Sequence, residues 1–233
     1  KMKEILTIDM GNTRSKVAHF ANNKCVDFCV FHNLESLESY IKTKKLPVIG
    51  CSVTTRPQFE GVEIIWLDGG WKLPFIIDVD EPNSVGADRI AAVFGALFLH
   101  PNKDLLIIDA GTCITYEYVS SNGTYWGGAI SPGLDLRFRA MHEHTAALPR
   151  LQAPKEFPPR EGKDTDSAMH SGVLFGFRAE IEERIEAFRS KNLDSVVIIT
   201  GGDASFLANP SKTGIFVEPM LLHFGLNYAY QSL

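Results

Sequence analysis

A short apolar segment that ends in Asp-x-Gly occurs twice in this chain of 233 residues. Residues 4–13 read EILTIDMGNT, and residues 105–112 read LLIIDAGT. Each copy is followed by a second apolar stretch, at 17–20 and at 114–119. Short runs rich in apolar and β-branched residues that stop at Gly and Asn are typical of strands that end in tight turns. The same unit of strand, Asp-Gly turn and strand is therefore predicted in each half.

The first of these turns has the residue types that bind a phosphate group. Gly11 lets the backbone approach an anion, and Asn12 and Thr13 can donate hydrogen bonds. Lys16 supplies a positive charge. Asp9 repels phosphate, so a cation is expected between them, and Mg²⁺ with part of its water shell fits this setting. A hairpin whose Asp, Gly and Asn merely form the turn explains one copy equally well. Two copies favour phosphate binding, because turns that face each other across a cleft would hold a polyphosphate from both sides.

Composition limits the classes of protein to which the chain can belong. Its length and 45% hydrophobic residues suit one large domain or two of about 100 residues. The repeat favours two, 1–101 and 102–233, with a boundary at His100-Pro101-Asn102. A formal charge of −5 argues against nucleic acid as the main partner.

No apolar run approaches the ~18–20 residues that span a membrane, and the first residues show no signal-peptide pattern. We therefore expect no membrane partner and a cytoplasmic protein. The four cysteines form no C-x-x-C pair, and three of them lie in apolar runs. Buried, reduced thiols are expected from this pattern rather than a zinc site or disulfides.

The hydrophobic pattern predicts strands before helices in the first half. We expect an antiparallel meander at 4–9, 16–21 and 25–31, a helix at 34–42, and strands at 47–52 and 62–67. An apolar helix begins at Gly86 and runs to residue 99. Its nearly uncharged surface predicts burial in the core or against a partner subunit.

The second half repeats the strand pair and adds a third strand at 124–130. Helices are expected at 134–147 and 165–190, and a proline-rich loop at 148–164 is expected to lie over the cleft. A buried strand at 195–200 ends in Gly201-Gly202, which would let a flat ring or a ribose approach the backbone. His142-Glu143-His144 is interpreted as a solvated helix face, because residues two apart on a helix point in different directions.

Asp88 and Arg89 lie where the apolar helix begins. Asp88 could simply complement the helix N-terminus, with Arg89 as a surface charge. The functional alternative is a carboxylate base next to a guanidinium that binds an anionic substrate, as phosphoryl transfer requires. No G-x-G-x-x-G or P-loop motif is present, so the other common nucleotide sites are disfavoured.

Taken in order, these segments resemble the type III pantothenate kinases of the actin, hexokinase and heat-shock-70 ATPase superfamily. Residues 9–13 are similar to the family's first phosphate motif, 86–89 to its substrate motif, and 109–112 to its second phosphate motif. Residues 127–133 and 165–172 match two further family segments. The resemblance implies an α/β fold with two ribonuclease-H-like (actin-like ATPase) domains and a nucleotide cleft between them.

What the resemblance implies for function is transfer of the γ-phosphoryl group of ATP to the primary hydroxyl of pantothenate, the first step of coenzyme A synthesis. Asp88 would be the catalytic proton acceptor. The residues that would bind ATP phosphates and Mg²⁺ are Asp9 (through water), Met10, Gly11, Asn12, Thr13, Arg14, Ser15, Lys16 and Thr112. Those that would bind pantothenate are Gly86, Ala87, Asp88, Arg89 and Thr165.

By the same resemblance, Asp109 would bind a monovalent cation, K⁺ or NH₄⁺, and the protein would be a homodimer with the substrate site completed across the interface. One departure is Val79, which stands where the family usually has a substrate-binding tyrosine. Three rival functions stay open: a non-catalytic accessory factor for transcription, another small-molecule kinase, and a phosphatase or ATPase. The intact set of Asp9, Asp88 and Asp109 argues against the first, and Arg89 favours an alcohol that carries a carboxylate.

Overall fold

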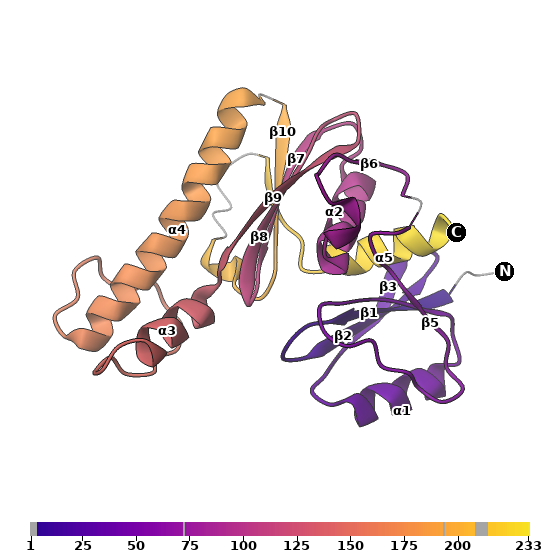
Figure 1. Ribbon diagram of the computed structural model, residues 1–233, viewed down its shortest axis with the longest axis horizontal. Helices are drawn as coiled ribbons and strands as arrows, with labels where there is room; N and C mark the ends of the chain where they lie inside the picture. Colours follow the sequence, from indigo (N-terminus) through magenta and orange to yellow (C-terminus); the bar gives the residue numbers. More distant parts are fainter. Residues whose placement is uncertain (1–3, 72, 193, 208–213) are drawn as a thin grey trace. The chain divides into compact units, whose positions relative to one another are not determined.

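The computed structural model describes residues 4–71, 73–192, 194–207 and 214–233 (Figure 1). The chain divides into two compact units. The first consists of segments 1–102, 119–127 and 220–233, and the second of segments 103–118 and 128–219. The first unit therefore contains two segments that a boundary after residue 101 would assign to the second half.

Five strands form the sheet of the first unit, in the order β3-β2-β1-β4-β5. The strands are β1 (Glu4–Met10), β2 (Ser15–Ala21), β3 (Lys24–Phe31), β4 (Val48–Ser52) and β5 (Ile64–Trp66). β1, β2 and β3 pair antiparallel, as the sequence predicts, and β4 runs parallel to β1. Because parallel strands end at the same edge, Asp9 on β1 lies beside Cys51 on β4.

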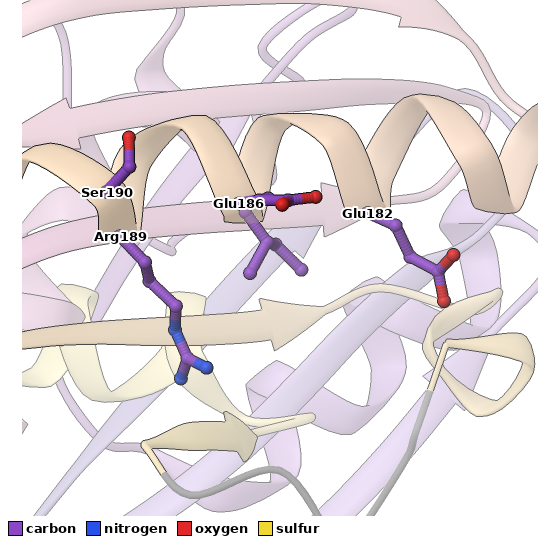
Figure 2. A pocket seen from close by; sticks show the side chains of 5 residues that line it. Glu182, Glu186, Arg189 and Ser190 are labelled. Atoms are coloured by element: carbon purple, nitrogen blue, oxygen red, sulfur yellow. The ribbon is translucent and has the colours of Figure 1, made fainter.

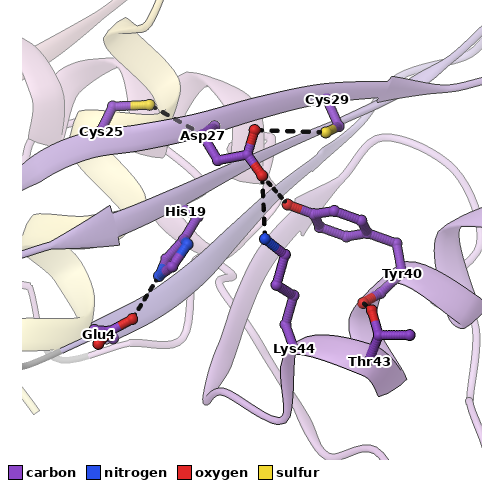
Figure 3. Close-up of polar contacts among 8 residues, drawn as sticks. All are labelled: Glu4, His19, Cys25, Asp27, Cys29, Tyr40, Thr43 and Lys44. Atoms are coloured by element: carbon purple, nitrogen blue, oxygen red, sulfur yellow. Dashed lines mark hydrogen bonds and ion pairs between the residues drawn. The ribbon is translucent and has the colours of Figure 1, made fainter.

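One face of this sheet is covered by α1 (Leu34–Lys44), which begins at the N-cap Asn33. Leu37 and Ile41 of α1 pack with Ile8 of β1 in a buried cluster. Figure 3 shows how polar groups tie the same helix to β3: the Asp27 carboxylate accepts hydrogen bonds from the Tyr40 hydroxyl at 2.9 Å and the Lys44 ammonium at 3.1 Å. These two hydrogen bonds lower the pKa of Asp27.

Two further helices of the first unit, α2 (Ala87–Leu99) and α5 (Leu221–Gln231), pack against each other, and α5 also contacts β1. They cross with their backbones in contact. A Cβ atom at Gly95 would lie 2.2 Å from the Leu221 carbonyl oxygen, and one at Gly225 would lie 1.8 Å from that of Ala91. The predicted burial of α2 is thus confirmed, and helix α5 of the same unit covers it.

A second sheet has the strand order β11-β10-β7-β8-β9-β6. The strands are β6 (Ile76–Ile77), β7 (Asp104–Ala110), β8 (Cys113–Val119), β9 (Thr124–Pro132), β10 (Ser195–Thr200) and β11 (Ile215–Val217). β7 runs parallel to β10, with Asp109 opposite Thr200. β6 pairs with the first residues of β9, which belong with it to the first unit. Short 3-10 turns occupy Pro82–Ser84 (η1) and Ala204–Phe206 (η2).

Helices α3 (Leu134–Glu143) and α4 (Thr165–Lys191) complete the second unit, and their apolar side chains share one core with β7. α4 begins with a capping box, in which the side chains of Asp164 and Ser167 each bond to the other's backbone. Between the helices, residues 144–164 have no regular structure, so α3 ends before the predicted residue 147 and the predicted loop at 148–164 is part of a longer one. This loop is anchored on α4: His170 Nε2 is 3.0 Å from the Gln152 carbonyl oxygen.

The cysteines depart from the prediction. All four are free, as expected, but Cys51 alone is buried, whereas Cys25 and Cys113 are exposed and Cys29 is half-buried. The expectation of buried thiols was wrong for these three because β3 is an edge strand and Cys113 begins β8 directly after a turn. Among the described residues, no helix is long and apolar enough to cross a membrane.

Candidate active site

The β1–β2 turn joins charged and polar groups at the edge of the first sheet. The Gly11 amide donates a hydrogen bond to the Arg14 carbonyl oxygen at 3.2 Å, which closes the turn. The Lys16 ammonium lies 3.3 Å from Asp9 Oδ2, and the side chains of Lys16 and Asp9 are 29% and 13% exposed. A partly exposed cation and carboxylate next to a tight glycine turn can bind a phosphate together with its metal ion.

Cys51 lies on the other side of Asp9. Its thiol donates to Asp9 Oδ1 at a sulfur–oxygen distance of 4.0 Å. Burial raises the pKa of Cys51, and the negative charges of Asp9 and Asp88 raise it further. The thiol is therefore protonated at neutral pH and acts as a hydrogen-bond donor rather than as a nucleophile.

Asp88 lies in the first turn of α2, two residues after the N-cap Gly86. Its Oδ1 accepts the Arg89 backbone N–H at 2.9 Å. Burial raises the pKa of Asp88 and the charge of Asp9 adds to this, while the bond from Arg89 acts in the opposite direction. A carboxylate with a raised pKa takes up a proton more readily, which suits a general base. A Cβ atom at Gly86 would lie 2.6 Å from Asp88 Oδ1, so glycine keeps this carboxylate accessible.

His223 of α5 is a site neighbour that sequence reasoning missed. Its Nδ1 lies 2.7 Å from the Thr7 hydroxyl on β1, two residues before Asp9. The ring is buried, and no hydrogen-bond partner is found for its Nε2. Burial lowers the pKa of His223 to about 4, so the ring is neutral at pH 7. No local signal could have found it, because the contact joins residues 216 positions apart.

The β7–β8 turn in the second unit is held by close backbone contacts. The Gly111 amide donates to the Cys113 carbonyl oxygen at 2.9 Å, and the Gly133 amide donates to that of Thr112 at 3.0 Å. A Cβ atom at Gly133 would lie 2.0 Å from the Gly111 oxygen, and one at Gly201 would lie 2.5 Å from Asp109 Oδ1. Gly201 also has a positive φ of 93°. Glycines therefore bring β9 and β10 against the turn that carries Asp109 and the exposed Thr112.

Asp203 is a second residue that sequence reasoning did not select. Its amide donates to the Ala110 carbonyl oxygen at 2.9 Å, and its carboxylate accepts the backbone N–H of Leu134. Burial raises the pKa of Asp203. The signal available is the Gly-Gly-Asp sequence that follows the buried strand β10, in which only the two glycines are predicted to approach a ligand.

The structure distributes the predicted site residues between the two units. The first unit brings together Asp9, Lys16 and Asp88. The second holds Asp109 and Thr112, and Thr165 is the first residue of α4. That the two turns face each other across a cleft stays a prediction.

Three predicted ligand-binding residues, Met10, Ser15 and Ala87, are buried. The apolar residues Met10 and Ala87 can therefore meet a ligand through the backbone alone. Val79, at the position of the family tyrosine, packs against the backbone of Gly127, where a Cβ atom would lie 3.1 Å from Val79 Cγ1.

A hollow of about 460 Å³ lies along the second half of α4 (Figure 2). It is lined by Glu182, Ile185, Glu186, Arg189 and Ser190. None of these is a predicted site residue. The hollow is therefore separate from the residues that carry the proposed chemistry.

The donor set of the first turn fits a magnesium ion that keeps much of its water. Within the described part of the chain, no three His, Cys, Asp or Glu side chains form a group that could hold a metal. Asp9 is a single carboxylate, partly exposed, and Mg²⁺ in phosphate sites is commonly held by one or two carboxylates together with water and phosphate oxygens. Asp9 therefore suits a Mg²⁺ ion that arrives with a nucleotide.

Solved structures resemble the whole chain. A Campylobacter jejuni protein described as a Baf family transcriptional activator aligns with a TM-score of 0.62 and 22% identity, covering 97% of this chain and 98% of that one. Glucokinase from an Antarctic psychrotroph aligns with a TM-score of 0.51 and 10% identity, covering 100% of both. At these identities the likeness shows the fold alone. The likeness confirms the predicted α/β fold of the actin-like kind with two domains.

Sequence comparison identifies the family. The profile of type III pantothenate kinases matches residues 47–187. The type III pantothenate kinase of Flavobacterium psychrophilum is 41% identical over 241 residues, which cover 97% of this chain and 98% of the relative. The chain therefore belongs to the type III pantothenate kinase family.

Proposed function

We propose that this protein is an ATP-dependent kinase that phosphorylates the primary hydroxyl of pantothenate. The observation that carries the proposal is the position of Asp88. This half-buried carboxylate lies at a helix N-terminus, near enough to Asp9 for the Asp9 charge to raise its pKa. A base next to a phosphate turn is what transfer to an alcohol requires. Family membership supplies the substrate pair, ATP and pantothenate.

In the proposed reaction, Asp88 accepts the proton of the pantothenate hydroxyl as its oxygen attacks the γ-phosphorus of ATP. One P–O bond forms to pantothenate, and the P–O bond to the leaving ADP breaks. Lys16 and the backbone from Gly11 to Thr13 bind phosphate oxygens, and Arg89 binds the pantothenate carboxylate. Asp9 would hold Mg²⁺ through water, and the ion would supply positive charge that neutralises the phosphates.

Three finer points also belong to the proposal. Asp109 binds a monovalent cation, K⁺ or NH₄⁺, next to the second turn, and its carboxylate lies against the backbone of Gly201, where a Cβ atom would be 2.5 Å from Oδ1. The active form is a homodimer in which Thr165 contributes to a pantothenate site shared between subunits. The reaction occurs in the cytoplasm, where ATP is available, and nucleic acid takes no part in it.

The test is formation of ADP and phosphopantothenate from ATP and pantothenate by the purified chain. We expect turnover that depends on pantothenate. ATP hydrolysis without an acceptor would instead indicate a phosphatase or ATPase, and no ATP consumption would indicate a regulator. A panel of sugars, acetate and N-acetylhexosamines, each offered in place of pantothenate, tests the remaining alternative, a kinase that acts on another small molecule.

The cation assignment is tested by measuring the same turnover in K⁺, NH₄⁺ and Na⁺. Activation by K⁺ or NH₄⁺ is expected in the wild-type protein and should weaken in Asp109→Asn. Asp104→Asn, at the other end of β7, is the matched control and should keep the activation. Wild-type kinetics that do not depend on the cation would remove Asp109 from this role.

A further inference from the structure

A polar cluster on the second unit is not used by the proposed mechanism. It is centred on Glu180, in the middle of α4. Glu180 Oε1 accepts the Tyr116 hydroxyl at 2.8 Å, and Oε2 accepts the Ser131 hydroxyl at 3.0 Å. The guanidinium of Arg137 forms an ion pair with the same Oε2. Both carboxylate oxygens are thus directed by partners from β8, β9 and α3.

Charge and packing keep the cluster in one arrangement. The side chains of Glu180 and Arg137 are 24% and 20% exposed. Partial burial would raise the pKa of Glu180, but the bonds from Arg137, Tyr116 and Ser131 outweigh it and lower the pKa, so Glu180 is ionised at neutral pH. The Arg137 guanidinium also lies 5.7 Å from the centre of the Phe177 ring, one turn before Glu180 on α4.

The cluster is connected to the second turn by backbone contacts. Besides its ion pair, Arg137 donates from Nε to the Pro132 carbonyl oxygen at 2.8 Å and from Nη2 to the Ser131 hydroxyl at 3.1 Å. Gly133, which follows Pro132 in the sequence, donates its amide hydrogen to the Thr112 carbonyl oxygen at 3.0 Å. A Cβ atom at Gly133 would lie 2.0 Å from the Gly111 oxygen, so the backbone of this segment lies directly against that of the turn.

We propose that Glu180 is a positioning residue for nucleotide binding: through Arg137 and Ser131 it fixes segment 131–133, which in turn fixes the Gly111-Thr112 turn against the phosphates of ATP. This inference rests on the proposed function in one respect, that the turn binds a nucleotide. A partly exposed ion pair adds little to stability by itself, about 0–1 kcal/mol. Loss of Glu180 should therefore change the turn more than it changes the fold.

The experiment compares Glu180→Gln with the wild-type protein by calorimetric titration with a non-hydrolysable ATP analogue and Mg²⁺. Glutamine keeps the size of the side chain but replaces an acceptor oxygen by a donor that faces Arg137. We expect the dissociation constant for the nucleotide to rise roughly ten-fold. The KM for ATP should rise similarly, while the KM for pantothenate and the unfolding temperature change little.

Glu182→Gln is the matched control. It removes the same charge from the same helix, and its exposed side chain lines the hollow in Figure 2. Residues two apart on a helix point in different directions, so Glu182 does not share the direction of Glu180. This variant should bind the nucleotide as the wild-type protein does. If Glu180→Gln does not fold, Ser131→Ala replaces it, because that change removes one bond to Glu180 and one to Arg137.

An unchanged nucleotide affinity in Glu180→Gln, or in Ser131→Ala where the first variant does not fold, would overturn the inference. Equal losses in Glu180→Gln and Glu182→Gln would overturn it too. Failure of the proposed function looks different: the wild-type protein would bind the nucleotide without phosphorylating pantothenate. The titration would still decide the role of Glu180 in that case, because it contains no pantothenate.

Discussion

The two Asp-Gly turns are built on the same scaffold and held in different ways. β1 and β7 have the same sequence of half-buried and buried positions, and each has a parallel neighbour, β4 or β10, beside its aspartate. Around Asp9 the contacts come from side chains, the thiol of Cys51 and the ammonium of Lys16. At the β7–β8 turn, the backbones of Gly133 and Gly201 lie in close contact with residues 109–112.

This difference suggests a division of work between the turns. Charged and hydrogen-bonding side chains can bind a phosphate and Mg²⁺. The first turn, with Asp88 nearby, therefore suits the phosphoryl-transfer step. Backbone contacts at glycines hold a turn in place without adding charge. The second turn therefore suits a role in positioning the phosphates, and we expect the two copies of the motif to have different roles.

The largest effect is expected from Asp88→Asn, which removes the base from the first unit. Turnover should fall by roughly 10²–10⁴-fold if Asp88 is a general base. Nucleotide binding and the unfolding temperature should be kept, because burial already disfavours the charged form of this side chain. The wild-type activity should decline on acidification around a pKa above the usual 3.8 of an aspartate, since protonated Asp88 cannot accept a proton. Near-wild-type turnover in the variant would assign the base elsewhere.

A second prediction concerns the buried histidine beneath the first turn. The pKa of His223 is lowered from 6.5 to about 4 in the folded chain, so between these values the unfolded chain binds the additional proton. The free energy of unfolding should therefore fall as the pH decreases from 6.5 to 4, by on the order of 3 kcal/mol in all.

Chemical denaturation of His223→Asn at several pH values checks this. The variant should lose much of the slope in this range, and His144→Asn, with an exposed side chain, should keep it. Equal slopes in His223→Asn and the wild-type protein would show that other groups cause the acid sensitivity.

A third pair of variants tests whether the second turn depends on close backbone packing. Gly133→Ala should lower the free energy of unfolding by about 1–3 kcal/mol, because its Cβ would meet the Gly111 oxygen at 2.0 Å. Its φ of −71° suits any residue, so the cost is steric. Gly11→Ala in the first turn meets its nearest atom at 3.4 Å and should change stability by less than about 0.5 kcal/mol. Similar losses at both positions, measured by denaturation, would remove the contrast between the turns.

The smallest effect is expected at Lys16. Lys16→Met removes the charge of the first turn and keeps most of the apolar stem, so the KM for ATP should rise roughly ten-fold. Lys42→Met, on the surface of α1, should leave it unchanged. Steady-state kinetics at varied ATP concentration measures both, and an unaltered KM in Lys16→Met would place the phosphate contacts elsewhere.

Local patterns were enough to predict much of this fold. The meander β1–β3, the doubled Asp-Gly turn and the helices α2 and α4 follow from periodicity, glycine and capping residues close to them in sequence. Helix α5 was not predicted. Gly225 in its middle counts against a helix locally, and the reason for it, contact with Ala91 of α2, lies far away in the sequence.

The residues of the candidate site also divide into those that the local sequence predicts and those that it does not. Asp9, Asp88 and Asp109 could be found because each stands beside glycine at the end or beginning of an element. His223 and Glu180 could not, because their contacts to Thr7 and Arg137 are made by folding. The raised pKa of Asp88 likewise depends on burial, which no motif encodes.

Binding of one nucleotide by both turns can be measured by hydrogen–deuterium exchange of the wild-type protein, with and without the non-hydrolysable ATP analogue and Mg²⁺. We expect slower exchange of backbone amides in both 10–16 and 110–113 when the nucleotide is bound. Slower exchange in one turn while the other is unaffected would contradict it.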